Sequence, residues 1–362
     1  MNDHKIQAKN STYSHAFKTY MQKLKAQKES FFKKKACQEV LDALLIYEYE
    51  IETRDDIRKF IHFMGKKNAK RTIQKFETIR FEGHLPEVTE YFEKNPENTE
   101  KVEALEQLSS IYGIGSVKAE NLYNKFGIKT IAQLRSMVFE TNADADRKHT
   151  GKVKDNDQII LTDSQLAGLK FYDDLNERIP RDEIIQYHKK LSGILATIDD
   201  TAKLCVAGSY RRGNRDSGDI DILLCSETLR LCDFTQQLND ITVRILANGQ
   251  KKCMLLSKLH DTSRVRHMDI IMTRPNQFAF AQLYFTGSKA FNIKMRKHAL
   301  SLGYSLNEYG LTRAKERKNV RHCKKEEGND SKINKTENIP QFYSEQDVFE
   351  FLNFPFVSPN ER

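Results

Sequence analysis

The stretch GSYRRGNRDSGDIDILL, residues 208–224, constrains this chain more than any other part of it. Its end alternates aspartate with isoleucine and then becomes apolar, which predicts a strand with Asp219 and Asp221 on one face. Two carboxylates held side by side repel each other, and they stay ionised only when cations lie between them. Because hard oxygen ligands suit Mg²⁺, the stretch predicts a divalent-metal site at the start of a buried strand.

A second strand-like stretch, RHMDIIM, supplies a third carboxylate, Asp269, between apolar neighbours. Three carboxylates on neighbouring strands could hold two metal ions, the arrangement used for in-line phosphoryl transfer. Ahead of the first pair, Gly208 and Ser209 are placed to form a strand-to-turn phosphate cradle. Arg212 adds a planar cationic clamp. The residues by themselves therefore indicate phosphoryl-transfer chemistry.

Charge is distributed unevenly along the 362 residues, whose formal net charge is +9. Residues 1–80 hold 18 Lys and Arg against 10 Asp and Glu. A basic arm in front of a neutral body suits a polyanion such as nucleic acid, although a lysine-rich surface from a biased genome explains the same numbers. No signal-peptide pattern or membrane-length apolar run occurs. We therefore expect no membrane partner and an intracellular location: the nucleus in a eukaryote, the cytoplasm or virion in a virus.

The first part of the chain has helical patterns. In residues 13–80 apolar side chains recur at three- and four-residue spacing, and Thr53 is placed as an N-cap. Further on, Gly113–Gly115 opens a helix, Gly127 closes it, and another helix follows. Two helices joined around such glycines form a helix-hairpin-helix, whose backbone N–H groups can approach a phosphate. The same glycines also occur in plain tight turns.

Strand patterns take over beyond Lys203, in the segments KLCVAGS, DIDILLC, ITVRILANG, KCMLLSKL and RHMDIIMT. Two polar segments interrupt the patterned sequence. Residues 141–156 are expected as a loop inserted between helices, and residues 313–337 as a basic insertion in the C-terminal part.

Taken together, these motifs resemble the family X DNA polymerases of the nucleotidyltransferase superfamily, in the layout of their beta-type members. The resemblance runs from about residue 35 to the C-terminus. It is carried by the GS-x-R-R-G…SGD-x-D motif and by the segments YGIGSVKAENLYNKFGIKTIAQLR, GLKFYDDLNERIPRDEI, LYFTGSKAFNIKMRKHALSLGYSLNEYGL and SEQDVFEFLNFPFVSPNER.

The resemblance implies an α+β fold. An all-helical N-terminal domain with helix-hairpin-helix motifs would precede fingers, a mixed nucleotidyltransferase palm sheet and a small α+β C-terminal subdomain. The expected domain ranges are 1–100 for the lyase-like DNA-binding domain, 101–182 for the fingers, 183–274 for the palm and 275–362 for nucleotide selection. No interaction domain of the breast-cancer-carboxy-terminal type is expected before residue 35.

The resemblance also implies roles for individual residues. Asp219, Asp221 and Asp269 would hold two Mg²⁺ ions, with Mn²⁺ able to substitute, and Asp269 would lie nearest the primer 3′-hydroxyl. The triphosphate would be held by Arg178, Gly208, Ser209, Arg212 and Gly218. The sugar and base of the nucleotide would meet Tyr284, Phe285, Gly287 and Asn292.

DNA contacts are implied as well. DNA would be bound by Gly113, Gly115, Lys118, Lys252 and Arg296, and by Lys66 and Lys67 in the N-terminal domain. Na⁺ or K⁺ would lie between the hairpin and a DNA phosphate, on the backbone carbonyls of Ser109, Ile111 and Ile114. Arg178 precedes an Ile-Pro pair, so we expect it at a turn with its side chain free.

The implied activity is that of a template-directed DNA polymerase that fills short gaps in base-excision repair. It would act as a monomer on gapped or nicked double-stranded DNA with deoxynucleoside triphosphates. A template-independent nucleotidyltransferase is an alternative, but no long loop between Asp221 and Asp269 replaces a template, and Tyr284–Phe285 opposes ribonucleotides. A DNA-end-binding scaffold with an inactive palm is disfavoured by the three intact carboxylates.

The chain departs from the family at two positions. His267 stands two residues before Asp269, where arginine is common, which predicts a changed hold on Asp269 and greater pH sensitivity. The lysine that removes 5′-deoxyribose phosphate should lie on the helix after the first hairpin, where alignment from Gly65 gives Arg71 and alignment back from Gly83 gives Lys75. Because arginine stays protonated and cannot form a Schiff base, Lys70 and Lys75 are the candidates. Lys70 follows an alanine, as in the family, and is favoured over Lys75. A polymerase without lyase activity stays an open alternative.

Overall fold

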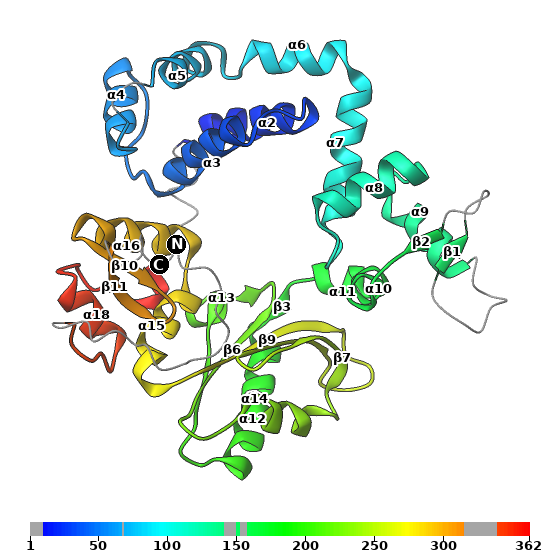
Figure 1. The fold of residues 1–362 in the computed structure, drawn as a ribbon, viewed down its shortest axis with the longest axis vertical. Helices are drawn as coiled ribbons and strands as arrows, with labels where there is room; N and C mark the ends of the chain where they lie inside the picture. Colours follow the sequence, from blue (N-terminus) through cyan, green and yellow to red (C-terminus); the bar gives the residue numbers. More distant parts are fainter. Residues whose placement is uncertain (1–9, 67–68, 141–149, 153–157, 315–338) are drawn as a thin grey trace, which may run out of the picture. The chain divides into compact units, whose positions relative to one another are not determined.

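The computed structural model describes residues 10–66, 69–140, 150–152, 158–314 and 339–362. These residues divide into two compact units, Met1–Tyr172 and Asp173–Arg362 (Figure 1). Lys67 and most of the polar segments 141–156 and 313–337 lie outside the described residues. Helices make up most of the first unit and a mixed sheet forms the second, so the predicted α+β class is confirmed. Within the described ranges, no helix combines the length and the apolar character needed to span a membrane.

The first unit begins with a helical bundle. Its members are α2 (Ser11–Ala26), α3 (Phe31–Ile46), α4 (Arg54–Phe63), α5 (Lys70–Glu82), α6 (Pro86–Lys94) and α7 (Pro96–Ser109). The apolar faces of α2 to α6 meet in one core, where Phe76 packs against Phe17 and Phe60 with ring centroids 5.1 and 5.0 Å apart. Helix α7 instead contributes Leu108 to the core of the helices that follow it. Thr53 caps α4 reciprocally, because its hydroxyl accepts from the Asp56 N–H while the Asp56 carboxylate accepts from the Thr53 N–H. The predicted N-cap is confirmed.

A second group of short helices completes the first unit. It comprises α8 (Ser116–Phe126), α9 (Ile131–Arg135), the π-helical η1 (Ser136–Glu140) and α10 (Asp163–Lys170), and α11 (Tyr172–Asn176) begins at the boundary with the second unit. Gly115 is the N-cap of α8, and Gly127 ends it in the left-handed conformation with φ of 66°, as the sequence indicated. Helix α7 continues through the expected boundary at residue 100, so the bundle runs into the hairpin without a break.

The segment 141–156 was expected to be a loop, and this is wrong for part of it. β1 (Thr150–Lys152) pairs antiparallel with β2 (Gln158–Ile160). Each strand has only three residues, which is too short to show an alternating pattern in the sequence.

A five-stranded mixed sheet organises the second unit. Its strands are β4 (Lys203–Val206), β6 (Ile220–Cys225), β9 (Arg266–Thr273), β8 (Lys252–Ser257) and β7 (Thr242–Asn248), in that spatial order. Neighbours are antiparallel except β6 and β9, which are parallel. All five predicted strands are therefore confirmed. A short pair, β3 (Ile179–Pro180) and β5 (Asp216–Ser217), lies outside this sheet.

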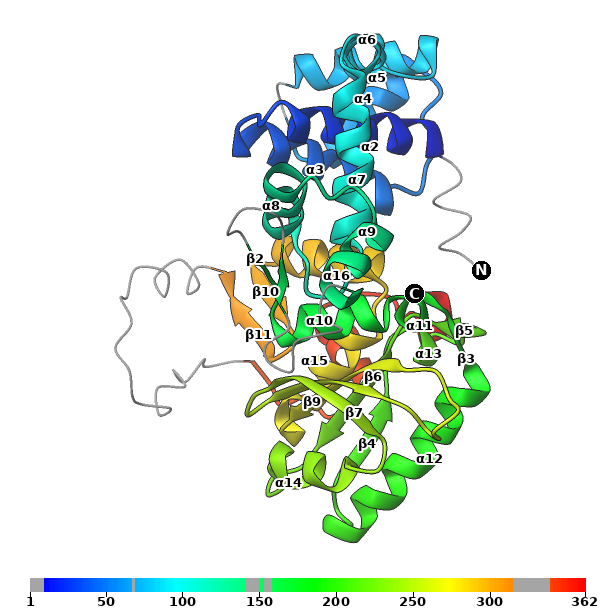
Figure 2. The same ribbon diagram turned by 90° about the vertical axis from the view of Figure 1, so that its right-hand side faces the viewer.

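The two faces of this sheet differ. α12 (Arg181–Ile198) and α14 (Leu231–Thr235) cover one face, below the sheet in Figures 1 and 2. There Ile220 and Ile222 of β6 and Met268 and Ile270 of β9 are fully buried. Because side chains alternate along a strand, the residues between them point to the opposite face, where α15 (Pro275–Thr286) packs.

The C-terminal subdomain is built on α16 (Lys289–Ser301), the antiparallel pair β10 (Tyr304–Asn307) and β11 (Gly310–Arg313), α18 (Glu345–Phe351) and the 3₁₀ turn η3 (Pro359–Glu361). The buried face of α16 carries Phe291, Met295 and Ala299, at the spacing seen in the sequence. The neighbouring Leu300 is 61% exposed. This core includes residues of α15 and α18, which joins the subdomain to the helix that borders the sheet.

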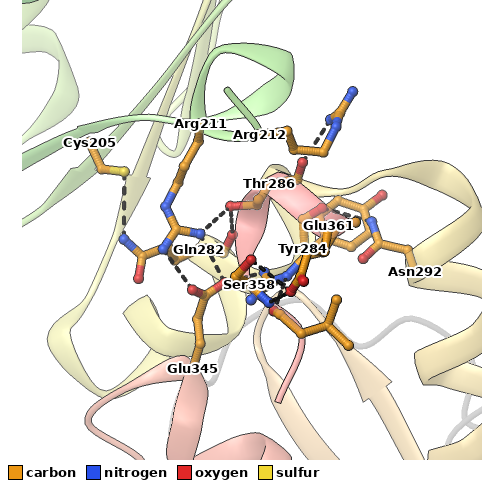
Figure 3. A network of polar contacts seen from close by, with 12 residues as sticks. Cys205, Arg211, Arg212, Gln282, Tyr284, Thr286, Asn292, Glu345, Ser358 and Glu361 are labelled. Carbon is orange, nitrogen blue, oxygen red and sulfur yellow. Dashed lines mark hydrogen bonds and ion pairs between the residues drawn. The ribbon is translucent and has the colours of Figure 1, made fainter. Parts of the chain in front are cut away.

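A buried ion network fastens the subdomain to the turn that follows β4. That turn contains the short helix α13 (Gly208–Arg211). Arg211 donates to the Thr286 hydroxyl at 2.6 Å and to both carboxylate oxygens of Glu345 at 3.0 and 2.6 Å (Figure 3). Glu345 also accepts from Arg362 at 2.7 Å, and the Arg362 side chain is fully buried between the rings of Phe291 and Phe349.

Removing Glu345 should destabilise the second unit strongly. In Glu345→Ala the buried guanidinium of Arg362 loses its counter-charge, so we expect a loss of about 3–5 kcal/mol in the free energy of unfolding. Glu350→Ala is the matched control, because this carboxylate is exposed on the same helix and should change stability by less than about 0.5 kcal/mol. Calorimetry of the full chain measures both, and equal effects would contradict the structural role of the network.

Candidate active site

Three aspartates lie on one face of the sheet at the β6–β9 junction. The parallel register pairs Asp221 directly with Asp269, and Asp219 comes immediately before β6. All three project from the face opposite α12, because the buried isoleucines of β6 and β9 take the alternate positions. Strand alternation therefore brings together the carboxylates that the sequence singled out.

The three carboxylates on this face repel one another because they lie close together. Burial and the nearby charges of Asp219 and Asp269 raise the pKa of Asp221 well above its ordinary value. Oδ1 of Asp269 is buried and has no hydrogen-bond partner among the described residues, and Nε2 of His267 is 3.6 Å from it. Burial lowers the pKa of His267, so this imidazole is neutral at pH 7 despite the neighbouring carboxylates.

The donor set fits a hard divalent cation. Burial and the neighbouring carboxylates disfavour the ionised form of Asp221. A cation bound among the three carboxylates would favour the ionised form instead. In their present positions, however, no three Asp, Glu, His or Cys side chains of the described residues are arranged to hold a metal ion. Asp269 is instead paired with Lys252, whose Nζ lies 2.6 Å from Oδ2. Side-chain movement at Asp269 would have to precede metal binding.

The turn after β4 approaches these carboxylates closely. Gly208 has φ of 57°, and a Cβ at this position would collide with Oδ2 of Asp221. Ser209 donates its hydroxyl hydrogen to Ser217 Oγ at 2.8 Å, and Arg212 donates to the Thr286 carbonyl at 2.8 Å. Gly208 of this turn thus lies directly against the side chain of Asp221.

Arg178 is not free, contrary to the sequence expectation. Its Nε donates to Asp216 Oδ1 at 2.7 Å and its Nη2 to the Asp216 carbonyl at 3.0 Å. The reason is that β3 and β5 pair Ile179 with Ser217, which places Arg178 beside Asp216. The guanidinium is still more than half exposed, and Gly218 lies next to it, where a Cβ would come 3.2 Å from Nη1.

The residues expected to meet the nucleotide gather at the end of α15 and the start of α16. Asn292 Nδ2 donates to the Tyr284 carbonyl at 2.8 Å (Figure 3). The Arg296 guanidinium lies 4.9 Å from the centre of the Tyr284 ring. Phe285 meets Tyr284 edge-on at 4.9 Å. Gly287 has φ of 66° and lies beside Arg212, which a Cβ would approach to 3.3 Å.

In the first unit, the turn between α7 and α8 carries the remaining hairpin residues. Ser109 ends α7, the side chains of Ile111 and Ile114 are buried, and Gly113 and Gly115 are exposed. The Ile111 carbonyl accepts from the Ile114 N–H at 2.9 Å, which leaves it a second lone pair. Lys118 was expected at DNA; here it donates to the Ile160 carbonyl at 2.6 Å, because β2 lies beside α8.

The candidate lyase lysines have different surroundings. Lys70 is exposed in the first turn of α5, and Lys66 forms an ion pair with Glu39 at 2.9 Å. The Lys75 side chain is about one-fifth exposed. Its Nζ lies 4.2 Å from the centre of the Tyr20 ring and pairs with Glu87.

Two features of the second unit were missed from the sequence. One is the pairing of Lys252 with Asp269, and the other is the network of Arg211, Glu345 and Arg362. Nothing in the local pattern could reveal them, because each joins residues far apart in the chain. The GSYRRG motif gave a partial signal, because it holds two arginines and only the second, Arg212, was assigned to a ligand.

The second unit matches two protein-family models. Residues 178–285 match the family model described as DNA polymerase beta palm, and residues 281–362 match the one described as DNA polymerase beta thumb. DNA polymerase lambda of Rattus norvegicus is 30% identical over 313 residues, which is 83% of this chain and 47% of that protein.

Two more distant relatives are a DNA polymerase lambda and a bacterial enzyme. DNA polymerase lambda of Arabidopsis thaliana is 26% identical over 74% of this chain and 47% of its own length. DNA polymerase/3′-5′ exonuclease PolX of Bacillus subtilis (strain 168) is 23% identical over 76% of this chain and 44% of its own length. The chain therefore spans about half the length of these relatives.

Adding a methyl group at Gly208 should disturb the site directly. Gly208→Ala imposes left-handed backbone on alanine and drives its Cβ into Asp221, so we expect a loss of about 1–3 kcal/mol in the free energy of unfolding. Nucleoside triphosphate affinity should fall with it, because the turn has to move. Thermal unfolding and titration with a fluorescent nucleotide measure the two effects.

Gly193→Ala is the matched control for this change. Gly193 lies inside α12, and a Cβ there meets nothing within 4 Å. We expect it to raise stability by about 0.5–1 kcal/mol and to leave nucleotide affinity unchanged. Wild-type nucleotide affinity in Gly208→Ala would show that the turn is not part of the binding site.

Proposed function

Because this chain belongs to the family X DNA polymerases, we propose that it is a template-directed DNA polymerase that fills short gaps during base-excision repair. Its substrates are gapped or nicked double-stranded DNA and deoxynucleoside triphosphates, and it acts as a monomer. The observation that carries the proposal is the register of β6 and β9, which sets Asp221 beside Asp269 next to the Gly208 turn.

Asp219, Asp221 and Asp269 are proposed as the ligands of two divalent cations, Mg²⁺ or Mn²⁺. When bound, such ions neutralise charge on a triphosphate and activate a hydroxyl for in-line attack. The buried Oδ1 of Asp269 supports this assignment, because it is an acceptor with no hydrogen-bond donor among the described residues. So does the raised pKa of Asp221, which a cation would return towards its ordinary range.

The side chains around the carboxylates are proposed to orient the nucleotide. Backbone amides at Gly208 and Ser209 and the guanidinium of Arg212 bind the triphosphate. Arg178 would also bind the triphosphate, after breaking its ion pair with Asp216. That ion pair is exposed and therefore weak. Gly218 has no side chain to obstruct that movement.

Selection of the sugar and base is proposed at the α15–α16 turn. Tyr284, Phe285 and Gly287 border the sugar and leave no room for a 2′-hydroxyl. Asn292 and Arg296 are one helical turn apart and both contact Tyr284, so they present their polar groups on one side of α16. Asn292 would meet the edge of the incoming base, and Arg296 the template strand.

The helix-hairpin-helix of the first unit is proposed to hold DNA backbone. Amides at Gly113 and Gly115, with Lys118, would contact phosphate. Na⁺ or K⁺ would bridge that phosphate to the carbonyls of Ser109, Ile111 and Ile114. Lys66 and Lys67 are proposed as further phosphate contacts, although Lys67 lies outside the described residues.

A 5′-deoxyribose phosphate lyase activity is also proposed, with Lys75 as its nucleophile. The amine that attacks the sugar aldehyde has to be neutral and held in place. The Lys75 side chain is mostly buried, and its contacts with Glu87 and the face of Tyr20 fix the position of its amine. These contacts favour Lys75 over the exposed Lys70, which reverses the preference drawn from the sequence.

Each aspartate should be essential for nucleotide addition. Asp219→Asn, Asp221→Asn and Asp269→Asn keep the side-chain shape but remove a ligand charge, so we expect incorporation into a one-nucleotide gap to fall by several orders of magnitude. Asp233→Asn, on α14, is the control and should behave as wild type. An incorporation rate within about tenfold of wild type, a barrier change of only about 1.4 kcal/mol, would exclude the altered residue as a ligand.

The same assay separates the polymerase from the alternative activity. A templating base should select its complementary nucleotide, and a single-stranded primer without template should not be extended. Extension of the single strand, or addition of all four nucleotides equally, would support a template-independent nucleotidyltransferase instead.

Borohydride trapping on an incised abasic substrate tests the lyase assignment. Lys75→Ala should abolish the covalent adduct, since the proposed nucleophilic amine is removed, whereas Lys70→Ala should keep it. An adduct lost only in Lys70→Ala would assign the nucleophile to Lys70. No adduct in the wild-type chain would mean a polymerase without lyase activity.

A further inference from the structure

Lys252 is placed where it competes with a metal ion. It is the first residue of β8, next to β9, and its Nζ lies 2.6 Å from Oδ2 of Asp269. The Asp269 side chain is only 14% exposed, whereas that of Lys252 is 45% exposed. The ammonium group therefore enters the carboxylate cluster from the solvent side, on a long flexible stem.

The charge of Lys252 acts on more than one carboxylate. Besides its direct contact with Asp269, it favours the ionised form of Asp221 electrostatically. A single positive charge thus offsets part of the repulsion among the three aspartates. A divalent cation that used Asp269 as a ligand would do the same more strongly, and it would need the oxygen that Lys252 now contacts.

We propose that Lys252 is an exchangeable counter-ion of Asp269, which a divalent cation displaces and which then becomes available to a DNA phosphate. The inference rests on the proposed function, since it takes Asp269 as a metal ligand and DNA as the substrate. Because the two ligands then act through one side chain, metal and DNA each strengthen the binding of the other by the same factor. Lys252 is a positioning residue in this scheme and touches no reacting atom.

Binding of Mn²⁺ to the protein without DNA or nucleotide tests the competition. Removing the competing charge in Lys252→Gln should tighten Mn²⁺ binding about two- to fivefold, the range expected for a partly exposed ion pair. Lys252→Arg keeps the charge and should restore wild-type affinity. Free Mn²⁺ is counted by electron paramagnetic resonance.

Lys251→Gln is the matched control, because it removes the same charge one residue away, at a side chain that lies over the Tyr309 ring. It should leave Mn²⁺ affinity close to wild type. Equal affinities in Lys252→Gln and Lys251→Gln would overturn the exchange. If wild-type Mn²⁺ binding persists undiminished in Asp221→Asn, the proposed metal site itself fails, so the two hypotheses are separated.

The reactivity of the lysine amine gives a second readout. Acetylation by a water-soluble ester, mapped by mass spectrometry, should be faster at Lys252 when Mn²⁺ is present, because the amine has left Asp269. Lys251 should react at the same rate with and without the metal. In Asp269→Asn, Lys252 should react fast under both conditions. Lys252 reactivity that Mn²⁺ does not change in the wild-type chain would contradict the displacement.

Discussion

Mutual repulsion of three aspartates on adjacent strands is the constraint around which the second unit is built. The parallel pairing of β6 and β9 places Asp221 opposite Asp269. The backbone at both aspartates is held in position, because the residues next to them in each strand are buried in the core under the sheet. Packing of Ile220, Ile222 and Met268 against α12 thus stabilises a charge arrangement that is unfavourable in itself. The packed apolar face of the sheet thus keeps the carboxylates on the opposite face in place.

The turn after β4 connects this charge cluster to the C-terminal subdomain. Its two adjacent arginines have different partners: Arg212 donates to the Thr286 carbonyl, and Arg211 to the Thr286 hydroxyl and to Glu345. Since Gly208 in the same turn lies against Asp221, the buried network around Glu345 also sets the distance between the turn and the carboxylates. The short helix α13 therefore contacts both the C-terminal subdomain and the carboxylate cluster.

What the sequence predicted well were features encoded by neighbouring residues. The five strands, the Thr53 cap and the Gly127 helix end follow from alternation, spacing and backbone preference, all of which are local. Side-chain partners were predicted poorly, because they depend on which strands become neighbours. Arg178 was expected to be free but meets Asp216 through the β3–β5 pair, and the contact of Lys252 with Asp269 was not predicted, because it depends on the pairing of β8 with β9.

Two ion pairs near β9 differ in how firmly their cation is held. Arg266, at the start of that strand, is 4% exposed and forms a bidentate pair with Glu183 at 2.8 Å on both oxygens. A planar guanidinium held in this way is a fixed part of the fold. Lys252 offers a compact charge, one contact and a solvated stem, which cost little to rearrange. Beside β9, the arginine is therefore part of the fold, and the lysine is the cation that we propose a metal ion displaces.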